Sequence, residues 1–481
     1  MVPCGETLPI NNPHAISVSM PTMQDVFDYE ERTGETTEKI KSAYPRFMRH
    51  PYIMRLVKYL ECKYELPSRL TFVLLSSQEA VVNMCVEKGV ENLFEVDEPF
   101  GVVTVRRNSE DLKAVLNYIQ VSGSILSSRA AEDYLHEVGE IEIKFEEELA
   151  SADSAESTIK QALAEAYHQS SEDVLLAPSG MNAVYSAVRG VLDEREKEGR
   201  EVLIQLGWLY SDSMTVVARY AKESVRFLDV EQLDALEDYL QANGHRVAGV
   251  LTEVPTNPQL KCVNLPRLRK LCDEYQIPLL IDTTIATPFL FDFTPYADVI
   301  IESLSKFASG NADLLMGAVV MNANRSAMHM KSAIFERIEP VCIGDLQRMA
   351  HSIEGYEERV RKSSANAAKL VKHFKQCDYV EKVFSHESGE SCVGLVSVKF
   401  KGDFKTIYDA LNLPKGPSLG TEFTLVMPYT YLAHYDLIQS EEGRELLAQI
   451  NLPIDLLRIS VGTEPIEEII VEFERIGLLS M

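Results

Sequence analysis

A regular alternation of strand-like and helix-like patterns runs from about Ser157 to Asn322, and it constrains the fold of this 481-residue chain more than any other feature. Short apolar runs typical of buried strands alternate with segments whose apolar residues recur every three to four positions, as in amphipathic helices. The predicted strands include DVLLAP, EVLIQLG, SVRFLD, VAGVLTEVP and PLLIDTT. This alternation predicts an α/β fold with a mostly parallel sheet sandwiched by helices, which binds ligands at the carboxyl ends of its strands.

The chain is too long for a single hydrophobic core, and its pattern changes on both sides of the alternating region. We expect an N-terminal extension with a small α/β domain over 1–121 and a large domain with a preceding arm over 122–325. A smaller C-terminal α+β domain is expected over 326–481. Residues 1 to about 20 are polar and rich in proline and asparagine, which predicts a loose arm.

Lys306 lies at the end of one predicted strand, in the segment ADVIIESLSKFASGNADLLMGAVVMN. A lysine at the mouth of a buried sheet is desolvated, which favours the neutral amine that can attack an aldehyde and form a Schiff base. Ser303 and Ser305 precede it and offer hydroxyl donors that suit a phosphate. For a lone lysine, a side chain that simply reaches solvent is the commoner arrangement, so the assignment depends on the other strand ends.

Two further strand ends fit pyridoxal phosphate. In Ser179-Gly180-Met181, a glycine opens a predicted helix, whose free N–H groups bind phosphate. Asp282 ends the strand PLLID, and a buried carboxylate there needs a cationic partner such as the protonated pyridine nitrogen of the cofactor. Taken singly, a strand–glycine–helix turn and a capping aspartate are both common as plain structure.

Three more residues complete the predicted set. Asn257, in EVPTNP, can present its amide to a ring hydroxyl; Tyr210, in GWLYSDS, can stack on a flat ring and exchange protons. Arg458, in LLRISVG, offers the bidentate fork that recognises a carboxylate. Each signal alone is also compatible with plain structure, namely a turn, a packed tyrosine or a surface arginine, and for a single tyrosine that is the commoner case. The ordered series at successive strand ends favours a cofactor site.

Composition excludes several other classes of protein. A net charge of −26 argues against nonspecific nucleic-acid binding and against docking on anionic membranes. The N-terminus lacks the pattern of a signal peptide, and no apolar run approaches a membrane span, so we expect a cytoplasmic protein. The eight cysteines are dispersed without a CxxC pair, which predicts free thiols and no metal site.

Together these motifs resemble the Cys/Met-metabolism family of PLP-dependent enzymes, which includes cystathionine γ-synthase, cystathionine γ-lyase, cystathionine β-lyase and methionine γ-lyase. The resemblance rests on SGM, PTNP, the strand-end aspartate, SLSK followed by GNAD, the SLG at 418–420 and RISVG. It covers roughly Ser122 to the C-terminus and is similar in detail to the fungal cystathionine γ-synthase-like branch. It implies PLP fold type I and a homodimer or homotetramer with shared active sites.

The resemblance also implies roles for single residues. Lys306 would carry the Schiff base and act as the catalytic base, Tyr210 would stack on the ring, and Arg458 with Ser418 would bind the substrate carboxylate. The remaining implied cofactor contacts are Gly180, Met181, Ser303 and Ser305 at the phosphate, Asn257 at the phenolic oxygen, Asp282 at the pyridine nitrogen, and Arg129 at the phosphate of a neighbouring subunit. The family's YxR motif here reads Ser127-Ser128-Arg129, so its tyrosine is absent.

The expected reaction is a γ-elimination or γ-replacement on an L-amino acid with a leaving group at Cγ, such as a homoserine ester, a cystathionine-like thioether or a γ-halo amino acid. A β-lyase acting on cystathionine-like thioethers would use the same residues. An aminotransferase could use the same scaffold, and a cofactor-free scaffolding protein is a third class that the sequence allows. The intact lysine, aspartate and arginine argue against a protein without cofactor.

Overall fold

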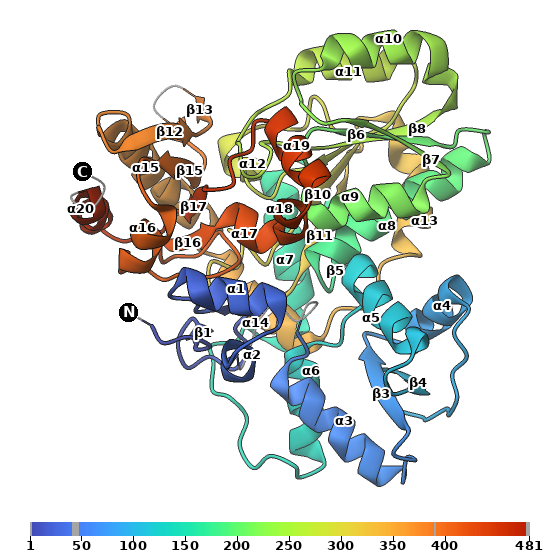
Figure 1. Ribbon diagram of the computed structural model, residues 1–481. Coiled ribbons are helices and arrows are strands. Elements are labelled where there is room, and N and C mark those ends of the chain that lie inside the picture. Colours follow the sequence, from blue (N-terminus) through green and yellow to red (C-terminus); the bar gives the residue numbers. More distant parts are fainter. Residues whose placement is uncertain (1, 41–47, 389–390, 478–481) are drawn as a thin grey trace.

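A seven-stranded sheet forms the centre of the computed structural model, which describes residues 2–40, 48–388 and 391–477 (Figure 1). The strand order is β5-β11-β10-β9-β8-β6-β7. The bounds are β5 (Val174–Ala177), β6 (Val202–Leu206), β7 (Glu223–Phe227), β8 (Val247–Glu253), β9 (Leu279–Asp282), β10 (Val299–Glu302) and β11 (Gly317–Met321). Strand β11 is antiparallel to both of its neighbours, and all other adjacent pairs are parallel, as the alternation predicts.

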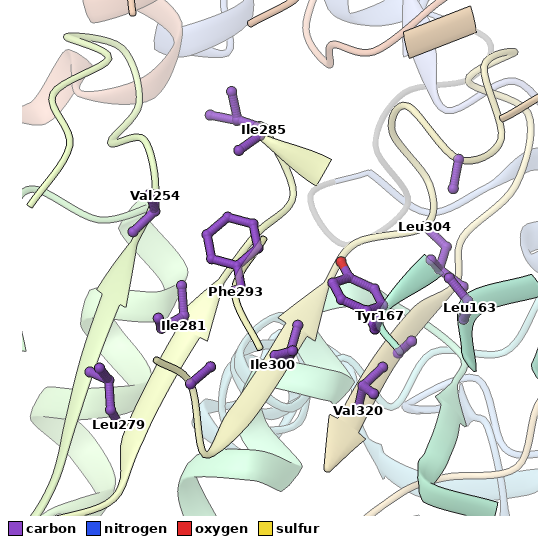
Figure 2. Close-up of a cluster of buried hydrophobic side chains, with 14 of the residues drawn as sticks. Leu163, Tyr167, Val254, Leu279, Ile281, Ile285, Phe293, Ile300, Leu304 and Val320 are labelled. Atoms are coloured by element: carbon purple, nitrogen blue, oxygen red, sulfur yellow. The ribbon is translucent and has the colours of Figure 1, made fainter. Parts of the chain in front are cut away.

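Helices cover both faces of this sheet because alternate residues of each strand project to opposite sides. One face packs against α7 (Ala152–Ala166), α10 (Leu233–Asn243), α11 (Leu265–Glu274) and α14 (Ile343–Ile353); the other packs against α8 (Gly180–Glu196), α9 (Ser211–Tyr220) and α13 (Lys331–Phe335). Figure 2 shows the first core, in which Leu279, Ile281, Ile300 and Val320 project from adjacent strands. Both faces are therefore apolar, and polar groups at the strand ends are left for the site.

A second, four-stranded antiparallel sheet forms the C-terminal domain. Its order is β12 (Val380–Phe384), β15 (Leu395–Phe400), β17 (Leu457–Ser460) and β16 (Leu425–Pro428). It packs against α15 (Tyr356–Phe374), α16 (Phe404–Ala410) and α20 (Ile466–Gly477). The shorter elements around it are β13 (Glu387–Ser388), β14 (Ser391–Cys392), α17 (Tyr429–Ala433), α18 (Tyr435–Gln439) and α19 (Glu441–Gln449).

A small α/β unit lies beside the large domain. It consists of the antiparallel pair β3 (Leu70–Leu75) and β4 (Gly101–Arg106) with α3 (Pro51–Lys63), α4 (Gln78–Lys88), α5 (Glu110–Ser122) and α6 (Ser128–Glu137). Phe72 and Leu74 face α3, whereas Val73 and Leu75 face α4 and α5. All six residues of β3 are buried, because helices cover both faces of this two-stranded sheet.

Residues 2–40 do not belong to that α/β unit, and those up to about residue 20 do not form the expected loose arm. They contain β1 (Thr7–Leu8), β2 (Ser17–Val18), α1 (Met23–Glu31) and α2 (Thr36–Lys39). Val18, Met20, Met23 and Val26 are buried in the hydrophobic core of the C-terminal domain. The prediction of a loose arm is wrong. It was based on the proline and asparagine content of the segment and overlooked the apolar residues that become buried.

The remaining short elements are α12 (Thr287–Leu290), η1 (Ser171–Asp173), η2 (Gly244–Arg246) and η3 (Ser326–Met330). Across residues 2–40, 48–388 and 391–477, every helix is too short or too polar to cross a membrane.

Candidate active site

A cavity of ≈ 360 Å³ lies against α6, but a larger one of ≈ 600 Å³ opens at the carboxyl ends of the central strands and contains most of the predicted site. Its walls come from the large domain, the C-terminal domain and α1. The predicted residues that line it are Gly180, Met181, Tyr210, Asn257, Asp282, Ser303, Lys306, Ser418 and Arg458. The residues from Gly180 to Lys306 meet here because parallel strands end at the same edge of the sheet, and the C-terminal domain adds Ser418 and Arg458.

The N-terminus of α8 forms one end of this cavity. Ser179 caps the helix, since its hydroxyl accepts a hydrogen bond from the Asn182 N–H at 3.0 Å. Gly180 lies so close to the residue that follows β10 that an added Cβ would be 2.5 Å from the Ser303 Oγ. Only glycine fits this turn. Free N–H groups at a helix start beside a serine hydroxyl are suited to an anion such as a phosphate.

Lys306 follows β10 in a tight turn, in which its N–H donates to the Ser303 carbonyl oxygen at 3.2 Å. Its ammonium Nζ donates to the Ser418 Oγ at 3.0 Å. Ser418 is held at φ 86°, a left-handed conformation that a serine rarely adopts. This strained serine from the C-terminal domain therefore lies directly against the candidate catalytic lysine.

Arg458 is buried on β17 without a carboxylate partner in ion-pair range among the described residues. It donates to the Ser418 carbonyl oxygen at 2.6 Å and more weakly to the Asn257 Oδ1 at 3.4 Å, and its guanidinium lies 5.2 Å from the centre of the Tyr429 ring. Burial lowers its pKa to about 10, so it stays charged at neutral pH. A buried, uncompensated cation that faces a cavity is poised for an anionic ligand.

Two carboxylates meet at the ends of neighbouring strands, because Glu253 on β8 is in register with Asp282 on β9. Glu253 accepts a hydrogen bond from the Tyr210 N–H at 2.6 Å, and Asp282 accepts one from the Thr284 N–H at 2.9 Å. Burial and then the charge of Asp282 raise the pKa of Glu253 well above its usual range. Burial also raises the pKa of Asp282, but bonds from Thr284 oppose this. Of the two carboxyl groups, Glu253 therefore has the stronger tendency to hold a proton.

Two predicted cofactor contacts lie elsewhere. Arg129 is 3% exposed and does not line the cavity; its guanidinium binds Glu147 at 2.6 Å and Asp345 at 3.0 Å. These contacts hold the guanidinium within its own chain, and the contact with the phosphate of a neighbouring subunit stays a prediction. The Ser305 hydroxyl binds the backbone N–H and carbonyl oxygen of Met316, behind the cavity wall formed by Ser303.

Sequence reasoning missed several residues of the cavity. Glu253 begins the EVPTNP motif, and its place at a strand end is the signal from which a role could have been inferred. Met20, Tyr29, Glu30 and Arg32 reach the cavity from the N-terminal segment. Their sequence carries no motif, so only the tertiary structure reveals them. Burial raises the pKa of Glu30 to about 7.

A sequence model of the Cys/Met metabolism PLP-dependent enzymes matches residues 151–476 of this chain. The chain belongs to this family. It is 35% identical over 484 residues to an L-2-amino-4-chloropent-4-enoate dechlorinase/desaturase of Streptantibioticus cattleyicolor, covering 96% of this chain and 95% of that protein. It is 27% identical to a cystathionine gamma-synthase-like enzyme, iboG1, of the fungus Amanita muscaria, covering 98% of this chain and 97% of that protein.

The fold is that of the PLP fold type I enzymes. A putative O-acetylhomoserine (thiol)-lyase of Campylobacter jejuni, solved with N'-pyridoxyl-lysine-5'-monophosphate, superimposes with a TM-score of 0.59 and 18% identity. The match covers 67% of this chain and 86% of that chain. The predicted fold class is thereby confirmed, and this chain is a PLP-dependent enzyme of the cystathionine γ-synthase/γ-lyase type.

The cavity fits the cofactor of this family, pyridoxal phosphate. The turn at Gly180 and Ser303 suits its phosphate. Lys306 suits the aldehyde, and Asp282 suits the pyridine nitrogen.

No cluster of histidine, cysteine, aspartate and glutamate side chains within the described ranges has the geometry of a metal site.

Proposed function

We propose that this enzyme eliminates a leaving group from Cγ of an L-amino acid, and that its substrates carry a γ-halogenated side chain. The observation that carries the proposal is that Ser418 contacts both Arg458 and Lys306, at 2.6 and 3.0 Å. A substrate carboxylate on Arg458 has its Cα one bond away, within reach of the lysine amine. Similarity to a dechlorinase over 96% of the chain supports the halogenated substrate class.

In this proposal, the N-terminus of α8 and Ser303 hold the cofactor phosphate, Asn257 contacts the phenolic oxygen, and Asp282 faces the pyridine nitrogen. Bound pyridoxal phosphate supplies an electron sink that makes the Cα proton of the amino acid acidic. Two adjacent buried carboxyl groups cannot both be ionised, so the pair retains one proton. Glu253 holds that proton in this proposal, and Asp282 stays charged.

Lys306 is proposed to move the protons. Its neutral amine accepts the Cα proton, releases that proton to the bound cofactor and, neutral again, accepts a proton from Cβ. The electron pair left at Cβ forms a double bond as the Cγ–halogen bond breaks. The halide leaves with that bonding pair and needs no proton. Leaving groups such as thiolates do need one, and Tyr210, whose ring lines the same cavity, is proposed to stack on the cofactor and to donate it.

We also propose that the enzyme is a cytoplasmic homodimer or homotetramer. All eight cysteines lie in the described residues and outside disulfide bonds, as is usual in a reducing compartment. Sedimentation velocity of the holoenzyme tests the assembly, and a monomer at micromolar concentration would contradict it.

The test is to incubate the holoenzyme with L-2-amino-4-chloropent-4-enoate, O-acetyl-L-homoserine, O-succinyl-L-homoserine and L-cystathionine, with and without L-cysteine. We expect chloride release from the chlorinated amino acid that does not depend on L-cysteine and is abolished by Lys306→Ala. Arg458→Lys keeps the charge but loses the planar fork, so KM should rise about 10- to 100-fold.

A different set of products would replace this proposal with another reaction. A new thioether amino acid formed only with a homoserine ester and L-cysteine indicates γ-replacement, which the similarity to cystathionine gamma-synthase-like proteins favours as the second candidate. Cleavage of cystathionine to pyruvate indicates a β-lyase, and amino-group exchange with a keto acid indicates an aminotransferase.

A further inference from the structure

The segment Ser17–Met23, which we call the N-terminal strap, lies across the loop Lys415–Gly420 of the C-terminal domain. The Ser17 hydroxyl donates to the Pro417 carbonyl oxygen at 2.6 Å, and the Met20 N–H donates to the Lys415 carbonyl oxygen at 2.9 Å. The contact is close, because a Cβ added to Gly416 would lie 2.3 Å from the Val18 carbonyl oxygen. The strap and the loop therefore pack backbone against backbone.

Lys415 belongs to the loop, and its buried side chain contacts the strap. It is 1% exposed, and its ammonium donates to the Pro21 carbonyl oxygen at 2.7 Å while lying 4.8 Å from the centre of the Tyr408 ring. The Tyr408 hydroxyl in turn donates to the Met20 carbonyl oxygen at 2.8 Å. Met20 itself reaches the wall of the active-site cavity.

The loop under the strap carries Ser418, whose backbone is strained at φ 86°. Such a conformation costs free energy and persists only where the surrounding structure holds it. Ser418 contacts both Lys306 and Arg458, so a shift of this serine moves the contacts of the base and of the carboxylate site together.

We propose that the N-terminal strap is a positioning element of the active site, and that Ser17 is the positioning residue that holds the loop on which Ser418 presents its hydroxyl and carbonyl groups. The strap lies outside residues 151–476, to which the family match is confined. The inference rests on the proposed role of Arg458 in binding the substrate carboxylate.

Ser17→Ala and Ser19→Ala form a matched pair of variants. Both serines are buried on the same segment, but the Ser19 hydroxyl donates to the Val2 carbonyl oxygen at 3.0 Å, away from the loop. Each variant loses one hydrogen bond and should lower the urea midpoint to a similar extent. Gly416→Ala is an independent perturbation, because it pushes the strap from the loop without deleting a polar group.

The first measurement is hydrogen–deuterium exchange of the holoenzyme. The Gly416 and Gly420 amides donate to the Val426 carbonyl oxygen at 3.0 Å and to the Ser460 hydroxyl at 2.7 Å. We expect faster exchange of these amides in Ser17→Ala but not in Ser19→Ala. This result does not depend on which reaction the enzyme catalyses, so it separates failure of the strap inference from failure of the proposed function.

The second measurement is the dissociation constant of L-norvaline, an amino acid without a leaving group, from the visible absorption of bound pyridoxal phosphate. Ser17→Ala should raise it about tenfold and Gly416→Ala at least as much, whereas Ser19→Ala should stay within about twofold. Equal exchange of the loop amides in the two serine variants would overturn the inference. Equal dissociation constants for L-norvaline, with the difference in exchange present, would instead contradict the proposed role of Arg458. Should Gly416→Ala fail to fold, the serine pair decides alone.

Discussion

Replacing Arg129 with alanine separates the cofactor role that the resemblance implied from the anchoring role that the structure shows. The guanidinium binds Glu147 through two nitrogens, at 2.6 and 2.7 Å, and Asp345 at 3.0 Å; it also donates to the Asp313 carbonyl oxygen at 2.9 Å. Arg129→Ala leaves the buried Asp345 and the half-buried Glu147 without their main cation. Removing one partner from such a network costs about 3–5 kcal/mol of the free energy of unfolding.

The assay is urea unfolding of the apoprotein, followed by titration of the folded protein with pyridoxal phosphate. Arg361→Ala is the control, because Arg361 is 59% exposed and its pair with Glu357 is worth under about 0.5 kcal/mol. Adding Glu147→Gln to Arg129→Ala should recover part of the loss by removing an uncompensated charge. Near-normal stability with pyridoxal phosphate binding weakened tenfold or more would refute the anchoring role.

Three further predictions concern the carboxylate pair, acid stability and the phosphate cradle. Asp282→Asn should lower kcat/KM at least 100-fold, while Glu253→Gln should change it less than about fivefold because the raised pKa of Glu253 favours its neutral form; equal losses would contradict this placing of the proton. Burial lowers the pKa of His434 to about 4, so the folded state loses stability as the pH falls from about 6.5 toward 4. His434→Gln keeps an acceptor for the Trp208 indole N–H, and the loss of unfolding free energy between pH 7 and 4 should shrink by about 3 kcal/mol; an unchanged pH profile in urea titrations would argue against a neutral histidine. Gly180→Ala should weaken pyridoxal phosphate binding in equilibrium dialysis by at least tenfold, since its methyl group would collide with a neighbouring serine hydroxyl, and unaltered binding would show that the cradle can move.

Much of this architecture is readable from local patterns. The spacing of apolar residues identifies the strands and helices of the large domain. Asp282 and Lys306 follow parallel strands, which end at the same edge of the sheet, so their meeting in one cavity is also predictable. The positions of Gly180, Asn257 and Arg458 in the cavity are likewise as the motif series predicts.

Other features have no local signature. Arg129 stands in a motif that resembles a cofactor contact, yet its partner Asp345 lies 216 positions away, and nothing near either residue predicts their pairing. The raised pKa of Glu253 depends on its burial and on the register between β8 and β9, which places a second carboxylate beside it.

The amino-acid sequence by itself determined the sheet, the family and nine of the residues that line the cavity, because periodicity and strand-end motifs are properties of neighbouring residues. Only the tertiary structure decided what surrounds them. Ser17 and Pro417 are 400 positions apart, and their hydrogen bond exists because the N-terminal segment is buried in the core of the C-terminal domain. Burial of that kind depends on how distant surfaces fit together, and no local pattern encodes it.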